Sequence, residues 1–184
     1  ERLAQDDPVT AARLVIGLVP AQRLRFDGEL TYDLTVTELG TFRVLLPAGS
    51  VDPLTEPGPR KDVDFHLEGT AAALAEFAAG GSRKRAKATH FDGSRRRLRK
   101  LLKVLRDPVQ LADAARAGAP VDPGVVLAAL AAATDGEQTA GHTFTVAWDV
   151  SGPLGGIWTV HVAGGRPRVD PGGPEGGATA TVHV

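Results

Sequence analysis

The sequence predicts an α+β protein, and two observations lead to that prediction. Segments with alternating apolar and polar residues, the pattern of half-buried strands, are interspersed with segments whose apolar residues recur at helical spacing. In addition, residues 32–49 (YDLTVTELGTFRVLLPAG) are matched 116 positions later by residues 148–165 (WDVSGPLGGIWTVHVAGG). Each copy has an alternating strand, a glycine-containing turn, a second alternating strand and a closing glycine, which together predict a β-hairpin.

The match between the two copies continues on both sides of the hairpin with slips of one residue. Asp7-Pro8 matches Asp122-Pro123 at an offset of 115, and residues 64–67 match residues 181–184 at an offset of 117. A nearly constant offset over about 60 residues indicates internal duplication. We therefore expect a complete unit, a helical linker and a partial second unit with one helix and three strands. The expected boundaries are residues 1–106, 107–121 and 122–184.

The composition is that of an ordinary globular chain, with 42 % hydrophobic and 23 % charged residues among its 184. No run approaches the ~20 apolar residues that a membrane-spanning helix needs. The chain has no cysteine, which excludes disulfides, thiolate metal sites and cysteine nucleophiles and leaves the redox compartment open. We expect a soluble, cytoplasmic protein.

The first helix of the complete unit is predicted to begin at Asp7-Pro8, because aspartate is a favoured N-cap residue and proline fits the first helical turn. Its apolar residues keep helical spacing up to Pro20, which is expected to end it. Two strands follow, at about 29–36 and 42–46, with apolar side chains at alternate positions along both.

The remainder of the complete unit is predicted from turn residues and periodicity. Residues 47–59 contain four prolines and two glycines and are expected to form a loop. A third strand is predicted at 63–67 and a helix at 71–79, which two glycines end. Residues 83–91 alternate only weakly, and we interpret them as an edge or solvent-facing strand before a turn at Asp92-Gly93.

The helix that follows Ser94 has the strongest amphipathic pattern in the chain. Its leucines fall at i, i+3, i+4 and i+7, and its opposite face is basic. Residues 83–106 contain eleven basic residues and one acid, which gives this segment a charge of +10 while the rest of the chain carries −11. Such a segment can attract an anionic partner even though the whole chain carries only −1.

The second copy is predicted to contain fewer elements than the first. A short helix at 109–117 precedes it, and a second Asp-Pro pair opens its own helix at Asp122. Strands are expected at about 142–150 and 156–163, followed by a glycine- and proline-rich loop through Gly177 and a final strand at 178–184. This copy lacks the second helix, the last strand and the final helix of the first.

The order of elements in the first copy resembles the sterol carrier protein type 2 domain family. The resemblance is carried by the hairpin at 40–49, the strand at 63–67, the helix at 74–80 and the turn at Asp92-Gly93 into the helix at 98–102. It covers residues 1–106 fully and residues 107–184 as a second, N-terminal part. It implies a mostly antiparallel five-stranded sheet covered by helices. An apolar cavity between sheet and helices would hold a sterol, fatty acid, acyl-CoA or phospholipid, with no cofactor.

The resemblance also implies which side chains line that cavity. We expect the lining to be Ile16, Phe42, Val44, Phe65, Leu74, Phe77, Leu98, Leu101 and Leu102. Each buried methylene contributes roughly 0.8 kcal/mol, so such a cavity could hold an acyl chain without any catalytic group. The same residues would equally form a filled core, and the sequence does not distinguish the two.

Three interpretations of the basic helix remain open. It could contact anionic lipid headgroups at a membrane surface, bind nucleic-acid phosphates, or be a solvated face. Nucleic acid is the least expected partner, because Phe91 is the one aromatic residue near this segment. The candidate anion contacts are Arg95, Arg96, Arg99, Lys100 and Lys103.

The sequence contains no recognisable catalytic or metal-binding motif. No histidine pair has HExxH spacing, no G-x-S-x-G occurs, and the glycine-rich stretches lack the features of a phosphate-binding loop. His66 and His183 are predicted to be equivalent, outward-facing strand residues, while Asp33 and Asp149 recur through the duplication. We expect a non-enzymatic lipid-binding protein without metal. The alternative is an interaction module with a filled core, in which the partial unit completes its sheet with the first unit or with another chain, the latter giving a homo-oligomer.

Overall fold

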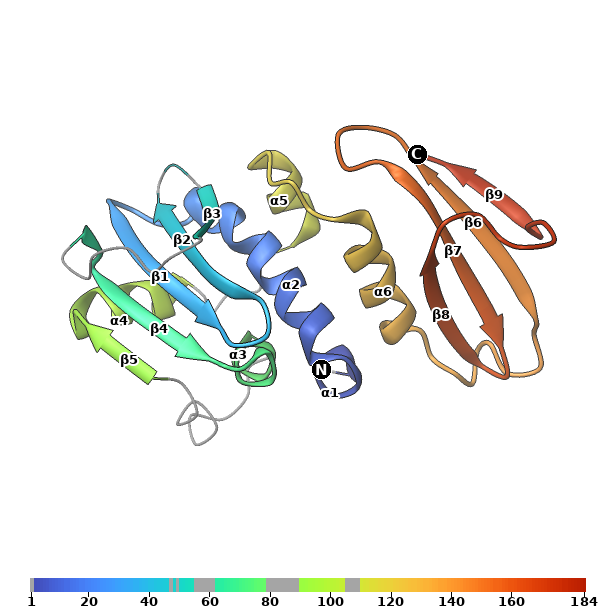
Figure 1. The fold of residues 1–184 in the computed structure, drawn as a ribbon, viewed down its shortest axis with the longest axis horizontal. Coiled ribbons are helices and arrows are strands. Elements are labelled where there is room, and N and C mark those ends of the chain that lie inside the picture. Colours follow the sequence, from blue (N-terminus) through green and yellow to red (C-terminus); the bar gives the residue numbers. More distant parts are fainter. Residues whose placement is uncertain (1, 47, 49, 55–61, 79–89, 105–109) are drawn as a thin grey trace. The chain divides into compact units, whose positions relative to one another are not determined.

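The computed structural model describes residues 2–46, 48, 50–54, 62–78, 90–104 and 110–184 (Figure 1). The chain divides into two compact units, residues 3–119 and residues 120–184. Each contains one mixed sheet, packed with several helices in the first unit and with one helix among the described residues of the second. The predicted α+β class is confirmed.

The first unit has helices on one face of a five-stranded sheet. Its elements are α1 (Arg2–Asp6), α2 (Pro8–Leu18), the 3-10 helix η1 (Val19–Leu24), β1 (Leu30–Val36), β2 (Gly40–Leu46), β3 (Ser50–Leu54), β4 (Phe65–Gly69), α3 (Ala71–Ala78), β5 (His90–Gly93), α4 (Arg95–Val104) and α5 (Leu111–Arg116). The strand order is β3-β2-β1-β4-β5. The β1–β4 pair is parallel and the other pairs are antiparallel.

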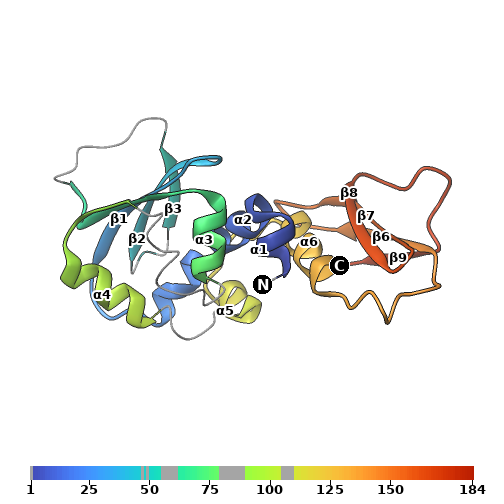
Figure 2. The same ribbon diagram turned by 90° about the horizontal axis from the view of Figure 1, so that it is seen from below.

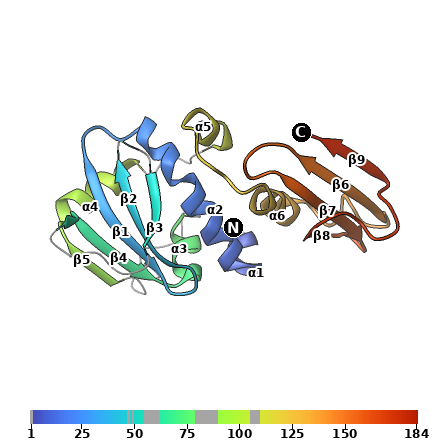
Figure 3. The ribbon, with the colours of Figure 1, turned by 45° about the horizontal axis from the view of Figure 1, so that its top comes forward.

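The second unit repeats that strand order without a fifth strand. Its elements are α6 (Pro123–Ala133), β6 (Phe144–Val150), β7 (Gly156–Ala163), β8 (Arg166–Pro171) and β9 (Ala180–His183). Among its described residues the order is β8-β7-β6-β9, as Figure 3 shows, and β6 and β9 are the parallel pair.

The core of the first unit lies between its sheet and its helices. Alternate residues of β1, which are Leu30, Tyr32, Leu34 and Val36, are buried on one face. Residues of α2, α3 and α4 join them in one cluster, so these helices cover the same face of the sheet (Figure 2). The period-2 pattern that predicted β1 therefore also identified its buried face.

The predicted helix starts are confirmed by their caps. The carboxylate of Asp7 accepts a hydrogen bond from the backbone N–H of Thr10 at 3.0 Å. The carboxylate of Asp122 accepts one from the N–H of Gly124 at 2.8 Å. Each cap satisfies a donor that the first helical turn leaves unpaired. Pro20 was expected to end the helical segment, but the 3-10 helix η1 continues through it to Leu24.

Two strands lie in segments that were predicted to be loops. β3 lies within residues 47–59, and β8 lies in the glycine- and proline-rich segment that precedes Gly177. Both are edge strands of their described sheets. Proline lacks the N–H that a central strand needs, but an edge strand tolerates it, so Pro53 and Pro167 fit these positions. The prolines of these segments led to the prediction of loops, whereas the structure has edge strands there.

The predicted third strand is displaced along the chain, and the turn predicted after residues 83–91 is part of a strand instead. β4 begins at Phe65, and the predicted turn at Asp92-Gly93 is the end of β5. Gly93 has a φ of 122°, and a Cβ atom there would lie 2.6 Å from the Cα of Phe65. Only glycine allows β5 to approach β4 this closely. Residues 83–89 of the predicted edge strand lie outside the described residues.

The two hairpins differ in the length of their turns. Val36 pairs with Gly40 in the first, whereas Val150 pairs with Gly156 in the second. The second turn is two residues longer, so β6 follows β1 at an offset of 114 while β7 keeps the offset of 116 from β2. Strand residues alternate with a period of two, so this shift leaves every side chain on its predicted face.

Candidate functional site

Most of the predicted cavity residues of the first unit belong to its packed core. Val44, Phe65 and Leu101 are at most 2 % exposed, and Ile16 is 8 % exposed. Phe42, Leu74 and Leu98 are partly buried against the same cluster. Leu102 is half-buried, and Phe77 is 39 % exposed. The structure therefore brings seven of the nine together, in one contiguous cluster.

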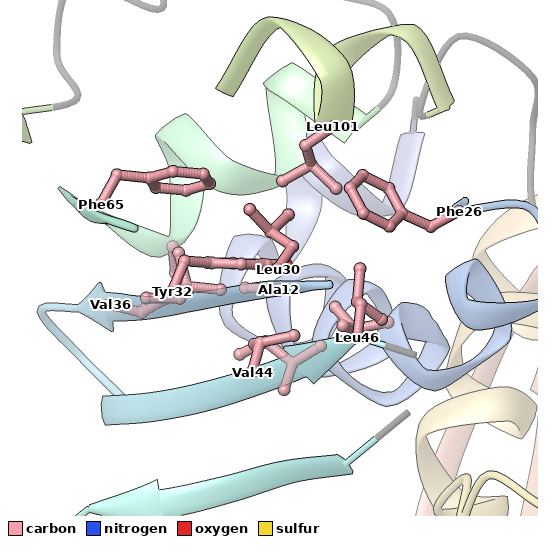
Figure 4. Packing of buried hydrophobic residues seen from close by; sticks show 13 residues of the cluster. Ala12, Phe26, Leu30, Tyr32, Val36, Val44, Leu46, Phe65 and Leu101 are labelled. Carbon is pink, nitrogen blue, oxygen red and sulfur yellow. The ribbon is translucent and has the colours of Figure 1, made fainter. Parts of the chain in front are cut away.

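Aromatic and leucine side chains fill the centre of this cluster. The rings of Tyr32 and Phe65 stack with their centroids 5.0 Å apart. Figure 4 shows Leu101 reaching from α4 toward Leu30, with Phe26 and Phe65 to its sides. Burial raises the pKa of the Tyr32 hydroxyl above its ordinary value, because the charged form would lose its hydration in the core. The α4 leucine fills the centre of the face on which the family resemblance places a ligand.

The second unit has an apolar groove between α6 and its sheet. The groove has a volume of about 220 Å³. Nine of its eleven lining residues are apolar, and the other two are threonines. The lining residues are Leu127, Leu130, Ala131, Thr134, Thr139, Phe144, Val146, Trp148, Val160, Val162 and Pro167. This groove is the candidate functional site.

Local sequence explains how α6 comes to lie against this sheet. A Cβ atom on Gly124 would lie 2.5 Å from Nε1 of Trp158. Glycine at this position therefore allows the first turn of α6 to approach β7. The two threonine hydroxyls already donate hydrogen bonds, Thr134 to the Leu130 carbonyl at 2.9 Å and Thr139 to the Gly165 carbonyl at 3.1 Å. The walls of the groove consequently present hydrocarbon.

The groove exists because the second sheet has less cover than the first. Leu130 at its rim is 54 % exposed, and Val146 and Trp148 on its floor are half-buried. In the first unit, β1 and β2 present the equivalent face to α2, α3 and α4. Among the described residues of the second unit, α6 is the helix that packs on the sheet. The sequence prediction noted the missing helices but assigned the cavity to the first unit.

Two of the basic residues of α4 have partners within their own unit. The Nζ of Lys100 donates to the Asp27 carbonyl and lies 4.8 Å from the centroid of the Phe26 ring. Arg97 donates to the Glu29 carbonyl at 3.0 Å and lies 3.4 Å from the carboxylate of Asp64. Lys100 was predicted to contact an anion, and here it joins α4 to the segment before β1.

Four other predicted cationic side chains of α4 point outward. Arg95, Arg96, Arg99 and Lys103 are all exposed. None of them forms a hydrogen bond or ion pair with another residue that the structure describes. We call these four residues the α4 cationic stripe. Leu105 and Arg106, which the prediction also placed on this helix, lie outside the described residues.

A buried ion pair lies on the other face of the first sheet. The Asp33 side chain is 2 % exposed and accepts two hydrogen bonds from Arg43, at 2.9 and 3.0 Å. Hydrogen bonding to Asp33 raises the pKa of the Arg43 guanidinium. His66 was predicted to face solvent, but its side chain is only 22 % exposed and its Nδ1 lies 3.5 Å from Asp33. The His66 Nε2 is buried without a hydrogen-bond partner in the structure.

The second sheet has a related pair at its surface. The Nδ1 of His183 lies 3.0 Å from the carboxylate of Asp149, whose side chain is 49 % exposed. Both aspartates lie opposite their histidines across the parallel strand pair. No cluster of three His, Cys, Asp or Glu side chains suited to a metal ion occurs within the described ranges. The Asp33–Arg43 pair joins neighbouring strands and has the geometry of a structural ion pair.

No protein-family model matches the sequence, and no curated protein is significantly similar to it. Within the part of the chain that the structure describes, no helix is both long enough and apolar enough to cross a membrane.

Proposed function

We propose that this protein binds an apolar small molecule without transforming it, and that the groove between α6 and the second sheet is the binding site. The ligand class is a fatty acyl chain, a sterol or the acyl part of a phospholipid. The observation that carries the proposal is an accessible groove of about 220 Å³ in which nine of eleven lining residues are apolar. Such walls select for hydrocarbon and offer no group for catalysis.

The resemblance to the sterol carrier protein type 2 family supports the same ligand class. The shared strand order supports reading the second unit as an incomplete copy of the first. The proposed site differs from the expected one, because Leu101 and six other predicted lining residues pack in the core cluster of the first unit.

The size of the groove sets the expected affinity. Binding sites for small molecules usually enclose about 300–1,000 Å³, so this groove would enclose one end of a long ligand. If about six methylenes are buried at ~0.8 kcal/mol each, the gain is roughly 5 kcal/mol. That corresponds to a dissociation constant on the order of 0.1 mM before ordering costs. The weak binding that we expect is suited to a carrier that must also release its ligand.

Tryptophan fluorescence provides the direct test. The two tryptophans of the chain are Trp148 and Trp158, so both lie in the second unit and Trp148 lines the groove. Titration with dodecanoic acid below its micelle concentration should shift the emission to shorter wavelength and saturate. Replacing Ala131 on the groove wall with Phe should weaken binding at least tenfold by filling the groove. Ala133→Phe, at an exposed position at the end of the same helix, is the matched control.

Two outcomes of this titration would refute the proposal. One is unchanged emission together with no bound lipid in the native mass spectrum. The other is equal binding by the Ala131→Phe protein and its control, which would place the ligand elsewhere.

Self-association is a second candidate function, and the position of β9 favours it. β9 occupies the place that β4 has in the first sheet, where β5 pairs with the far side of β4. No described strand pairs with the far side of β9. An unpaired edge of this kind can add a strand from another chain. Light scattering across a concentration series should then show a dimer that Thr181→Lys disrupts, whereas a concentration-independent monomer mass would exclude this function.

A further inference from the structure

We infer that the first unit binds anionic lipid surfaces through the α4 cationic stripe, by charge alone and without inserting into the membrane. This site lies on different residues from the groove of the second unit, so either proposal can fail without the other.

The stripe forms one continuous side of the helix. Arg95, Arg99 and Lys103 lie at i, i+4 and i+8, which places successive cations about 6 Å apart along the axis. Arg96 lies beside them on the same exposed side. All six cations of the helix are exposed, but the four of the stripe lack described partners, whereas Arg97 and Lys100 bond within the unit.

Helix formation alone does not favour these cations. Like charges four residues apart repel each other. Arg95 and Arg96 also lie in the first turn, where the helix dipole favours acids over bases. Leu98 and Leu101 already hold α4 in place by packing in the core. An external negative surface would relieve the repulsion that the stripe creates.

The way α4 packs favours a flat partner over a nucleic acid. Leu98, Leu101 and Val104 pack against the core, so one side of the helix is covered along most of its length and the α4 cationic stripe lies on its outer side. A helix that reads DNA enters a major groove about 12 Å wide, nearly its own diameter, and must project from the protein to do so. Binding of single strands relies on stacking aromatics, but Phe91 packs in the core beside Phe65. A lipid surface requires neither feature.

The same packing determines how the membrane is contacted. An interfacial amphipathic helix binds by burying its apolar face among the lipids. The corresponding leucines of α4 are committed to the protein core, and Leu101 is only 2 % exposed. Binding must therefore depend on anionic lipid and decline steeply with salt, as the Debye length falls from about 10 Å at 0.1 M to 3 Å at 1 M.

Vesicle sedimentation with the whole 184-residue chain tests this inference. One set of vesicles is pure phosphatidylcholine, and in the other a third of the lipid is phosphatidylglycerol. The protein should bind the anionic set alone. Each cation near such a surface contributes enough for about a fivefold change in partitioning. The double variant Arg95→Gln/Arg99→Gln should therefore bind about 25-fold more weakly.

The control is Arg13→Gln/Arg166→Gln, which removes two exposed positive charges from outside α4. It should bind within about twofold of the unchanged protein. Both double variants should keep the melting temperature of the unchanged protein, because all four substituted arginines are exposed. Equal binding to both vesicle sets, equal weakening in the control, or binding that persists in 1 M salt would each overturn the inference. Salt-sensitive binding to duplex DNA without vesicle binding would assign the stripe to nucleic acid instead. Ala131→Phe should not change vesicle binding.

Discussion

The two units have sheets of the same strand order but differ in what covers them. In the first, α2, α3 and α4 bury one face of the sheet, so Leu30 is 1 % and Tyr32 3 % exposed. In the second, α6 covers the equivalent face in part, and Phe144 and Val146 in the same strand positions are half-buried. The same alternating pattern thus produces a packed core in one unit and an open groove in the other. The alternation of apolar residues determines which side chains share a face of the sheet. Whether that face is covered depends on the helices that pack against it.

Truncating Leu101 in the core of the first unit should have the largest effect on stability. It should also leave a cavity between sheet and helices, as the second unit has a groove there. Leu101→Ala is expected to cost about 3–4 kcal/mol, because it deletes buried methyl groups and leaves a cavity. The half-buried Leu102→Ala on the same helix should cost about 1–2 kcal/mol. Denaturant unfolding followed by circular dichroism should show unfolding at a lower denaturant concentration. Tryptophan emission, which reports the second unit, should keep its midpoint. Equal costs for the two leucines would contradict the assignment of Leu101 to the core.

The Asp–His pairs of the two sheets should differ in their contribution to stability. Asp33→Ala leaves the partly buried Arg43 without its bidentate partner and should cost about 3 kcal/mol. Asp149→Ala removes a carboxylate with a half-exposed side chain beside His183 and should cost less than about 1 kcal/mol. Urea unfolding of both variants measures the contrast. A cost near zero for Asp33→Ala would mean that Arg43 finds another acceptor.

The packing at the start of α2 and of α6 allows a test in which a smaller ring compensates for a larger neighbouring side chain. Val9 follows the Asp-Pro pair in the first unit, and Gly124 follows it in the second, where Trp158 takes the place of Phe42. Gly124→Val should cost about 2 kcal/mol, because its side chain would meet the Trp158 ring. Adding Trp158→Phe should recover part of that loss, as measured by thermal unfolding of the second unit. No recovery would show that the backbone, not the ring, limits the approach.

The N-cap of α2 should give the smallest effect and a defined pH dependence. Hydrogen bonding from Thr10 lowers the pKa of Asp7 below 3.8. Its contribution is therefore complete above about pH 4 and is lost as the pH falls through the lowered pKa. Asp7→Ala should cost about 1 kcal/mol at pH 7. The difference between the two proteins should shrink at pH 2, and a difference that stays constant between these pH values would contradict the role of the carboxylate.

The features that sequence predicted well depend on neighbouring residues. The caps at Asp7 and Asp122, the hairpins and the buried face of β1 follow from short-range patterns, and the structure shows each of them. The edge strands β3 and β8 were missed because their prolines were read as loop signals. Whether a strand lies at an edge depends on which other strands pair with it, and that is not encoded locally.

For the candidate site, the sequence by itself determined which faces of the strands and helices are apolar and which are charged. It identified apolar faces on the strands, a basic face on α4 and a second copy with fewer helices. Only the tertiary structure decided where an apolar groove lies. Leu101 packs in the core of the first unit, Lys100 and Arg97 donate hydrogen bonds to neighbouring backbone, and α6 leaves part of the second sheet uncovered. The physical reason is that a cavity is defined by the volume that side chains from distant segments leave empty, and no single segment specifies that volume.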